Sequence, residues 1–222
     1  MKIRMGIDVG GTHTKAVAID NDTQQIVGNP SVVMTTHDDK LGVAKGVVDS
    51  FTKCLEENNI RPEDVVFVAH STTQATNALL EGDVANVGVF AVAGGGIEGF
   101  LAKRQSRLDD IDLQTGRVIR VLNAFLKKKQ FNPENIQKTI EDLEKQGADV
   151  IVASMTFGVD SAEEENMIRD AAVQHGLMAT MASEITKLYG LTRRTRTAVI
   201  NASILPKMLN TANCTEQSVR QA

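Results

Sequence analysis

The N-terminal twenty residues constrain the fold most, because they contain two short apolar strand-like segments joined by Gly10-Gly11-Thr12. Glycine has no Cβ, so its backbone can approach an anion closely and adopt positive φ. The hydroxyl groups of Thr12 and Thr14 can donate hydrogen bonds to phosphate oxygens. The segment therefore predicts a β-hairpin whose turn binds phosphate. An ordinary tight hairpin with Gly-Gly as its turn residues is the alternative.

Asp8 stands at the end of the first of these strands and is the candidate metal ligand. Mg²⁺ in proteins prefers one or two carboxylates together with phosphate oxygens and retained waters. A carboxylate just before a phosphate-binding turn can therefore order Mg²⁺ through its water shell. For this reason Asp8 is the one residue predicted to be catalytic.

Strand-like and helix-like segments alternate after this hairpin. A third strand is expected at 25–36, where Asn29-Pro30 indicates an edge position or a bulge. Apolar residues at steps of three and four predict a helix at 40–58, with Asp38 or Asp39 suited to its N-cap. The apolar run at 65–70 is typical of a buried strand. This alternation predicts an α/β fold with a mixed or parallel sheet.

Further elements are expected along the rest of the chain, except at 100–112, where the sequence is polar and irregular. Asn132 is the predicted N-cap of one helix, Ser161-Ala162-Glu163-Glu164 fits a capping box for another, and Pro206 is expected to kink or end the last. The remaining predicted strands lie at 86–93, 118–122, 149–156 and 177–182, and the helices at 71–82, 132–146, 161–175 and 195–209.

No repeat or low-complexity linker divides the chain. We therefore interpret residues 1–210 as one domain, with a phosphate-hairpin half at 1–93 and a remaining α/β part at 94–210. Residues 211–222 are polar, carry no strand signal and form a tail that is a candidate for disorder.

Composition excludes several classes of function. The net charge of −4, the absence of Trp and the single Tyr argue against a nucleic-acid partner. No apolar run reaches the roughly 18–20 residues of a membrane span. The N-terminus leads directly into a strand without a signal-peptide pattern, and Cys54 and Cys214 form no metal or redox motif. A reduced, cytoplasmic protein is expected, with Cys54 as buried filler.

A second candidate segment, Thr72-Thr73-Gln74-Ala75-Thr76-Asn77, directly follows the strand predicted at 65–70. Ligands of open α/β sheets bind at the carboxyl ends of strands, and a helix N-terminus adds N–H donors for anions. Thr72, Thr73 and Asn77 are therefore candidates for lining a ligand cleft. The alternative, that Ser71 or Thr72 only caps a helix, is equally compatible with the sequence.

Three segments together resemble the N-terminal part of the hydantoinase/oxoprolinase family, the ATP-dependent cyclic-amide hydrolases. The resemblance covers nearly the whole chain, and the second segment is the most specific. The segments are Gly6-Ile7-Asp8-Val9-Gly10-Gly11-Thr12-His13-Thr14, similar to G-I-D-V-G-G-T-F-T; Thr72-Thr73-Gln74-Ala75-Thr76-Asn77-Ala78-Leu79-Leu80-Glu81, similar to T-T-x-A-T-N-A-L-L-E; and Arg194-Thr195-Arg196-Thr197-Ala198-Val199-Ile200-Asn201-Ala202 with Pro206, similar to R-T-x-T-x-V-x-N-A followed by Pro.

The resemblance implies a ribonuclease-H-like α/β fold of the actin-like ATPase superfamily, with a mixed sheet, flanking helices and an N-terminal hairpin as phosphate loop. It implies ATP and Mg²⁺ as cofactors and a cyclic amide such as a hydantoin or 5-oxoproline as substrate, whose amide oxygen the γ-phosphate would activate. Asp8 would then order Mg²⁺. Phosphate would be held by Gly10, Gly11, Thr12 and Thr14, and the cleft would be lined by Thr72, Thr73 and Asn77.

The sequence departs from the family pattern at two positions of the hairpin. His13 stands where the family usually has Phe, and Lys15 where it usually has Asp. Lys15 could offer a positive charge to phosphate. Asp-x-Gly-Gly-Thr-x-x-Lys is closer to certain pantothenate or glucose kinases, so a small-molecule kinase of the same superfamily is an alternative function.

Family members also run several hundred residues further and contain a second actin-like half. We therefore expect a C-terminal half or a partner subunit to complete the cleft, in a homo- or hetero-oligomer, and the 222-residue chain to be inactive alone. A non-catalytic nucleotide-binding or assembly subunit is a further alternative.

Overall fold

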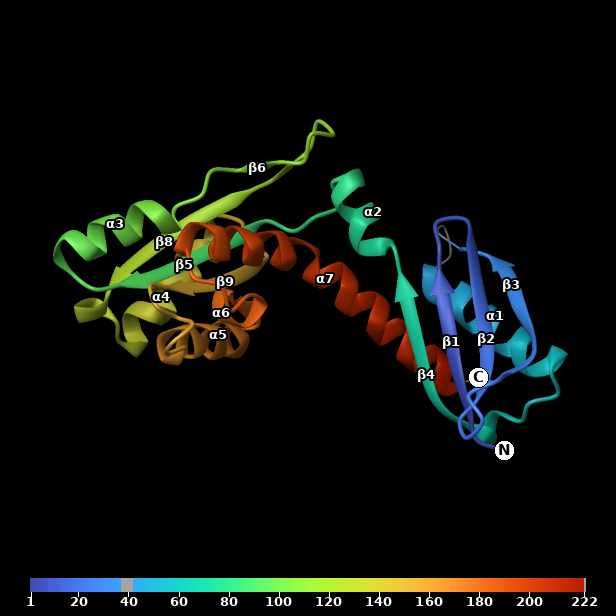
Figure 1. Cartoon of the computed structure of the whole chain (residues 1–222). Coiled ribbons are helices and arrows are strands. Elements are labelled where there is room, and N and C mark those ends of the chain that lie inside the picture. Colours follow the sequence, from blue (N-terminus) through green and yellow to red (C-terminus); the bar gives the residue numbers. More distant parts are fainter. Residues whose placement is uncertain (37–41, 222) are drawn as a thin grey trace. The chain divides into compact units, whose positions relative to one another are not determined.

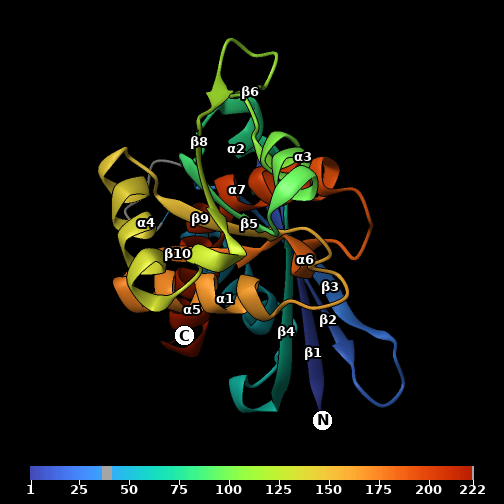
Figure 2. The same ribbon diagram turned by 90° about the vertical axis from the view of Figure 1, so that its left-hand side faces the viewer.

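The computed structural model describes residues 1–36 and 42–221, and Figures 1 and 2 show its elements. Contacts divide the chain into two compact units. Unit 1 consists of residues 1–77 and 207–222, and unit 2 of residues 78–206. Two helices, α2 (Gln74–Glu81) and α7 (Leu191–Gln221), contain residues of both units.

The sheet of unit 1 has four strands in the order β3-β2-β1-β4. Strands β1 (Ile3–Val9) and β2 (His13–Asp20) pair antiparallel, as do β2 and β3 (Ile26–Met34), whereas β4 (Val65–Thr72) runs parallel to β1. The strand pairing of the predicted hairpin and the third strand are therefore confirmed, while phosphate binding by the turn stays a prediction. The position of β3 at an edge of the sheet agrees with the interpretation of Asn29-Pro30.

Helix α1 (Val43–Glu57) covers one face of this sheet and confirms the helix predicted at 40–58. Its apolar stripe follows from the spacing of three and four residues in the sequence. Cys54 is fully buried in this core, as expected. The N-cap of α1 is Gly42, while Asp38 and Asp39 lie outside the described residues. The core contains Ile3, Met5, Ile7 and Val9 of β1 and Val47, Phe51, Cys54 and Leu55 of α1.

Strand β4 is the main exception to the predicted burial. The sequence predicts a buried strand, but Val66 is 52% and Phe67 56% exposed. The strand lies at the edge of the sheet, and only Val65 and Val68 pack against the core of unit 1. The prediction of burial was wrong because no element in the described part of the chain covers the rest of this apolar run.

Unit 2 is built on a parallel sheet of four strands in the order β10-β9-β5-β8. These strands are β5 (Val87–Ala93), β8 (Val121–Lys127), β9 (Val150–Met155) and β10 (Met178–Met181). Every residue of β5 and β9 is buried, as their continuous apolar sequences predict for central parallel strands. A small antiparallel pair, β6 (Ile111–Asp112) and β7 (Val118–Ile119), accompanies them.

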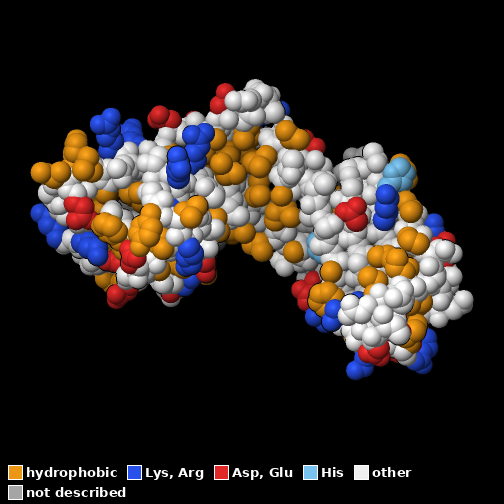
Figure 3. Space-filling model, in the orientation of Figure 1, with side chains coloured by type: hydrophobic (Ala, Val, Ile, Leu, Met, Phe, Trp, Pro, Cys, Tyr) orange, Lys and Arg blue, Asp and Glu red, His pale blue; other side chains and the backbone are white. Residues whose placement is uncertain are grey.

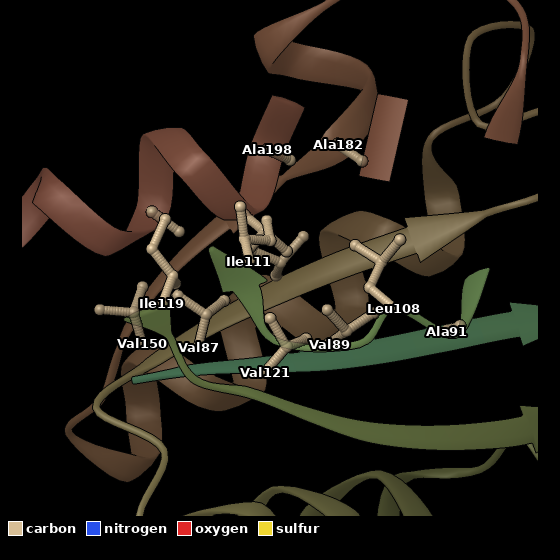
Figure 4. Packing of buried hydrophobic residues seen from close by; sticks show 13 residues of the cluster. Val87, Val89, Ala91, Leu108, Ile111, Ile119, Val121, Val150, Ala182 and Ala198 are labelled. Carbon is tan, nitrogen blue, oxygen red and sulfur yellow. The ribbon is translucent and has the colours of Figure 1, made fainter. Parts of the chain in front are cut away.

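Helices cover both faces of the unit 2 sheet. On one face α4 (Pro133–Lys145) and α5 (Glu163–His175) pack against alternate residues such as Phe90 and Ile151. On the other face lie the β6–β7 pair, α6 (Ala182–Ile185) and the first half of α7 (Figure 4). The buried hydrophobic residues on this second face include Val87, Val89, Ala91, Val150, Val152, Ala182, Ala198, Val199 and Ala202. Unit 2 therefore has three layers.

The structure can be compared with the N-caps predicted for two helices, α4 and α5. The side chain of Asn132 accepts a hydrogen bond from the backbone N–H of Asn135 at 2.9 Å, which confirms this N-cap of α4. The capping box predicted for α5 is wrong, because its N-cap is Ala162 and no side chain caps it. The third acidic residue of α5, Glu165, is instead buried.

Two further differences concern helices. Helix α3 (Gly96–Ser106) occupies part of the segment expected to be irregular, and its large apolar residues Ile97 and Phe100 are exposed, so no periodic pattern revealed it. Helix α7 continues through Pro206 to Gln221, so residues 211–221 are helical rather than disordered. Pro206 lies where unit 2 ends. In the described part of the chain, none of the helices is both long and apolar enough to cross a membrane.

Single 3₁₀ turns complete the elements, η1 (Pro62–Asp64) before β4 and η2 (Lys128–Gln130) after β8. Lys127 ends β8, and Lys128 and Lys129 lie in η2. Lys128 forms an ion pair with Glu164 at 2.6 Å.

The turn between β2 and β3 should be sensitive to acid. Asp20 Oδ1 accepts hydrogen bonds from the backbone N–H groups of Thr23 at 2.8 Å and Asp22 at 2.9 Å, which hold the pKa of Asp20 below the ordinary value of 3.8. Because the folded pKa is lowered, this stabilisation is present above the ordinary pKa and is lost as the pH falls through the folded pKa. An NMR titration of the Asp20 carboxyl should show it. A midpoint at or above 3.8 would contradict this prediction.

Candidate functional site

The candidate site lies where β1 and β4 end. These strands are parallel, so their carboxyl ends lie at the same edge of the unit 1 sheet. Asp8 on β1 is in register with Lys15 of β2 on one side and Ser71 of β4 on the other. The strand order therefore places Asp8 between Lys15, which is cationic, and Ser71, which has a hydroxyl group.

Asp8 is exposed, and its closest polar partner comes from β4. Ser71 Oγ donates a hydrogen bond to Asp8 Oδ1 at 2.7 Å. Both residues, with Lys15 and His70, line a hollow of about 600 Å³ in unit 1. The sequence suggested Ser71 only as a possible helix cap. Its contact with Asp8 depends on the register of β1 and β4, which no local sequence pattern reveals.

The turn of the hairpin is held by backbone and threonine hydrogen bonds. The N–H of Gly10 donates to His13 O at 3.0 Å. Thr35, just after β3, donates from Oγ1 to Gly10 O at 2.8 Å and from its N–H to Thr12 O at 2.9 Å. The turn is thus held to the residue that follows β3.

The two glycines of the turn do not use positive φ, contrary to the general expectation for such a turn. Space explains Gly10 instead, because a Cβ there would lie 3.0 Å from His13 O. A Cβ on Gly11 would meet nothing within 4 Å. Gly10 is therefore needed for the close approach of the two chain segments, whereas a side-chain carbon at Gly11 would fit without a clash.

Because of this difference, we expect Gly10→Ala and Gly11→Ala to change the free energy of unfolding by different amounts. Gly10→Ala should lower the free energy of unfolding of unit 1 by about 1 kcal/mol, because the hairpin must open around the new Cβ. Gly11→Ala is the matched control and should stay within about 0.5 kcal/mol of the parent. Denaturant unfolding followed at unit 1 measures both. Equal stabilities of the two variants would show that the close approach at Gly10 is unimportant.

Thr12 and Thr14 have different surroundings. Thr12 is exposed, with Oγ1 3.1 Å from His13 Nδ1. Thr14 is fully buried, and its Oγ1 lies 3.0 Å from Thr35 Oγ1. A direct contact between Thr14 and phosphate, as expected from the sequence, does not fit this burial. Thr14 instead stabilises the turn indirectly, because its hydroxyl contacts Thr35, which donates hydrogen bonds to the turn.

The second candidate segment begins next to this turn. Thr72 ends β4 in register with Val9, and its Oγ1 accepts a hydrogen bond from the N–H of Gln74 at 3.1 Å. This bond agrees with the capping interpretation of Thr72. Thr73 is exposed, and its N–H donates to Val9 O at 3.4 Å. Asn77 lies one turn further along α2, bonded through its N–H to Thr73 O.

The structure therefore brings most of the predicted site residues to one edge of unit 1. Asp8, the Gly10–Thr12 turn, Lys15, Thr72 and Thr73 belong to this edge through strand register and hydrogen bonds. Ser71 is an addition to the set. Asn77 is half-buried and is linked to the edge only through the backbone of α2.

The donor set fits one kind of metal site. Within residues 1–36 and 42–221, no three His, Cys, Asp or Glu side chains cluster closely enough to hold a metal ion by themselves. Asp8 supplies a single exposed carboxylate. Mg²⁺ often binds through one carboxylate, retained waters and the phosphates of a ligand. The residues present therefore fit a magnesium–phosphate complex rather than a metal held by protein groups alone.

The third segment of the sequence resemblance has a structural role in unit 2. Arg194 is buried, donating from Nη2 to Met155 O at 2.6 Å and from Nη1 to Leu188 O at 3.2 Å. Thr195 Oγ1 lies 2.7 Å from Ser154 Oγ. These contacts attach the start of α7 to the carboxyl end of β9.

Glu165 binds the same end of β9. Its side chain is fully buried, and Oε1 accepts from the N–H of Met155 at 2.9 Å. Oε2 accepts from the N–H and the Oγ of Ser183, at 3.0 and 2.6 Å. Both the N–H and the C=O of Met155 are thus held by buried charged side chains, Glu165 and Arg194.

These features define an α/β protein whose N-terminal β-hairpin presents a glycine-rich turn and a carboxylate at one sheet edge. Residues 4–176 match the hydantoinase/oxoprolinase N-terminal region. The chain belongs to the hydantoinase/oxoprolinase family, as its three sequence segments indicated. A search of curated protein sequences finds no match.

Two solved structures share the fold. A nucleotide-free structure of acetone carboxylase, from a study of ATP-dependent acetone carboxylation, has a TM-score of 0.69 and 15% sequence identity, covering 99% of this chain and 34% of its own. The ATP-dependent caprolactamase of Pseudomonas jessenii has a TM-score of 0.58 and 20% identity, covering 97% of this chain and 34% of its own. The chain therefore spans about a third of the length of these proteins.

Proposed function

We propose that this chain is the N-terminal, phosphate-binding part of an ATP-dependent enzyme that opens a cyclic amide such as a hydantoin or 5-oxoproline. The single observation that carries the proposal is the position of Asp8 beside the Gly10–Thr12 turn, at the carboxyl ends of β1 and β4. Family membership and a fold shared with two enzymes described as ATP-dependent support it. The order β3-β2-β1-β4 supports a ribonuclease-H-like, actin-like ATPase fold for unit 1.

The residues of the turn would bind and orient phosphate. Backbone N–H groups at Gly11 and Thr12, with the exposed Thr12 hydroxyl, are suited to phosphate oxygens. Gly10 would keep the turn tight, and Thr14 would support it through Thr35. Lys15 would add positive charge next to Asp8. Thr72, Thr73 and Asn77 would line the adjoining part of the cleft.

Asp8 would hold Mg²⁺ through its water shell, and Ser71 would fix the orientation of the carboxylate by its hydrogen bond to Oδ1. The metal ion would supply positive charge that neutralises the phosphates of ATP. Because phosphoryl transfer depends mainly on positioning and electrostatics, these residues need only bind and orient the nucleotide.

The overall reaction would couple the hydrolysis of ATP to the hydrolysis of the cyclic amide. The γ-phosphoryl group would pass from ATP to the amide oxygen, leaving ADP. Water would then add to the activated carbonyl carbon, and cleavage of the ring C–N bond would leave an acyl phosphate and a free amine. A second water molecule would hydrolyse the acyl phosphate to the carboxylic acid and inorganic phosphate. The products balance as ADP, phosphate and the ring-opened amino acid derivative. In this scheme the present chain contributes the phosphate side of the cleft.

The other side of the nucleotide cleft would come from a part of the enzyme outside this chain. The related structures are about three times as long as the matched part, so we propose that a C-terminal region or partner subunit completes the cleft, in a homo- or hetero-oligomer. A cytoplasmic setting, with ATP and Mg²⁺ present, is part of the proposal.

A direct assay tests this function. The chain alone, given ATP, Mg²⁺ and either a hydantoin or 5-oxoproline, should show no turnover near the typical enzyme range of roughly 1–10³ s⁻¹. Adding the C-terminal region should produce ADP, phosphate and the ring-opened product together. Turnover in that range by the chain alone would contradict the proposed incompleteness.

Lys15 favours one competing function, a small-molecule kinase of the pantothenate or sugar type. The same assay distinguishes it, because a kinase would form a phosphorylated product without opening an amide. Nucleotide binding that never leads to turnover, even with the C-terminal region present, would instead favour a non-catalytic assembly subunit.

A further inference from the structure

A polar pocket in unit 2 lies between the end of α3 and strand β8. Its volume is about 450 Å³, within the range of roughly 300–1,000 Å³ that small-molecule sites occupy. Lys103, Ser106 and Arg107 line it on the α3 side, residues 121–125 line it on the β8 side, and Gln146 lines it at the end of α4. None of the described residues that line it is acidic. The pocket therefore has the charge of an anion site.

The two cationic side chains of this pocket are not paired with acidic groups. Neither Lys103 nor Arg107 forms an ion pair within residues 1–36 and 42–221. The ammonium group of Lys103 lies 6.0 Å from the centre of the Phe125 ring, close enough for a cation–π contact. Figure 3 shows Lys and Arg side chains around α3 at the surface of unit 2. An anion that enters the pocket would therefore meet two cations that have no acidic partner.

Hydrogen bonds hold the segment that contains Arg107 against β8. Asn123 Oδ1 accepts from the N–H of Leu108 at 3.0 Å, and Asn123 Nδ2 donates to Leu108 O at 2.8 Å. Arg107 also borders a smaller hollow that Asp110 lines, but Asp110 Oδ1 already accepts from the N–H of Val121 at 2.8 Å. The backbone at Arg107 is therefore fixed before a ligand arrives, which lowers the entropy cost of binding.

The helix dipole accounts for some of the positive charge here, but not for Arg107. Lys103 and Arg104 lie in the last turn of α3, where positive charge complements the dipole. Arg107 is the C-cap residue beyond that turn, and it lines the pocket, whereas Arg104 does not. A guanidinium group can hold a carboxylate or a phosphate by two parallel hydrogen bonds. Arg107 therefore has both the position and the chemistry of an anion-binding residue.

We propose that this pocket binds a small organic anion, whose terminal carboxylate or phosphate group contacts Lys103 and Arg107. The carbon skeleton of the ligand lies against the ring of Phe125, which lines the same pocket. Both cations are exposed to water, which weakens charge interactions, so we expect a dissociation constant of about 0.1–1 mM. The pocket belongs to unit 2, whereas Asp8 and the β1–β2 turn belong to unit 1, and the inference does not rest on the proposed function.

An NMR titration of the ¹⁵N-labelled chain tests this site without measuring catalysis. Succinate and glycerol 2-phosphate are added separately, at constant ionic strength and without nucleotide or Mg²⁺. We expect saturable shifts at residues 106–108 and 121–125, and the probe that saturates shows whether the ligand group is a carboxylate or a phosphate. If neither probe shifts these residues at concentrations up to about 10 mM, the proposal is wrong. Shifts confined to the β1–β2 turn would support the proposed function and also overturn this site.

Matched variants separate a specific site from a general effect of charge. Arg107→Gln should weaken binding by about 10-fold or more, because it removes the paired donors together with the charge. Arg104→Gln removes the same charge from an exposed position on the same helix end and should change affinity by less than about 2-fold. Arg107→Lys keeps the charge without the paired donors and should give an intermediate affinity. Circular dichroism checks that all three variants fold. Equal weakening by Arg104→Gln and Arg107→Gln would overturn the proposal.

Discussion

Replacing Glu165 with alanine should lower the free energy of unfolding of unit 2 by about 3–5 kcal/mol. Glu165 is fully buried and accepts hydrogen bonds from the N–H of Met155 and from the N–H and Oγ of Ser183. Alanine would leave these donors without acceptors, and each buried unsatisfied donor costs about 1–3 kcal/mol. It would also leave the buried guanidinium of Arg194 as the charge next to Met155.

Denaturant unfolding, read by hydrogen exchange in β9, measures this effect. The matched control is Glu163→Ala, two residues earlier on the exposed side of α5, which should change stability by no more than about 0.5 kcal/mol. Glu165→Gln keeps one of the two acceptor oxygens and should fall between the two. If Glu165→Ala is as stable as Glu163→Ala, the buried contacts at β9 contribute nothing to the stability of unit 2.

The second large effect is expected at Asp8. Asp8→Asn should weaken magnesium-dependent binding of ADP by about 10-fold or more, equivalent to about 1.4 kcal/mol, because a neutral amide cannot hold the ion's water shell. Asparagine keeps an oxygen that can accept the Ser71 hydrogen bond, and the side chain is exposed, so the fold should be unaffected.

Titration calorimetry or NMR with ADP, in Mg²⁺ and in EDTA, measures the change. Asp22→Asn is the control, since it removes the same charge from an exposed turn before β3, away from the carboxyl end of β1. Ser71→Ala should have a smaller effect than Asp8→Asn, because it loosens the carboxylate without removing it. Magnesium-dependent affinity that survives Asp8→Asn would exclude Asp8 as the metal ligand.

Local sequence patterns predicted most of the elements, but not the exposure of β4 or the burial of Glu165. Asn132 before Pro133 was correctly predicted as an N-cap, and the segment around Gly10-Gly11 was correctly predicted to connect two antiparallel strands, because both effects depend on the nearest residues. The burial predicted for β4 was wrong because burial depends on elements far away in the sequence. Glu165 illustrates the same limit, because its burial depends on contacts with Met155 and Ser183 outside its own helix.

In the candidate site, too, local features could be predicted from the sequence and contacts between distant segments could not. The position of Asp8 beside the turn could be predicted, because a carboxylate and glycines next to a strand end form a local pattern, while their binding role stays a prediction. Ser71 could not, because its contact with Asp8 requires the register between β1 and β4. The burial of Thr14 also depends on a partner outside the hairpin, Thr35.

The most direct test is whether the β1–β2 turn binds phosphate. Backbone amide shifts of the ¹⁵N-labelled chain can be recorded while ADP and Mg²⁺ are added together. We predict that the largest shifts occur at Gly10, Gly11 and Thr12 and at residues 71–73, and that Asp8→Asn reduces them. Shifts confined to other parts of the chain, or no shifts at saturating magnesium and nucleotide, would contradict the assignment of this edge as the phosphate site.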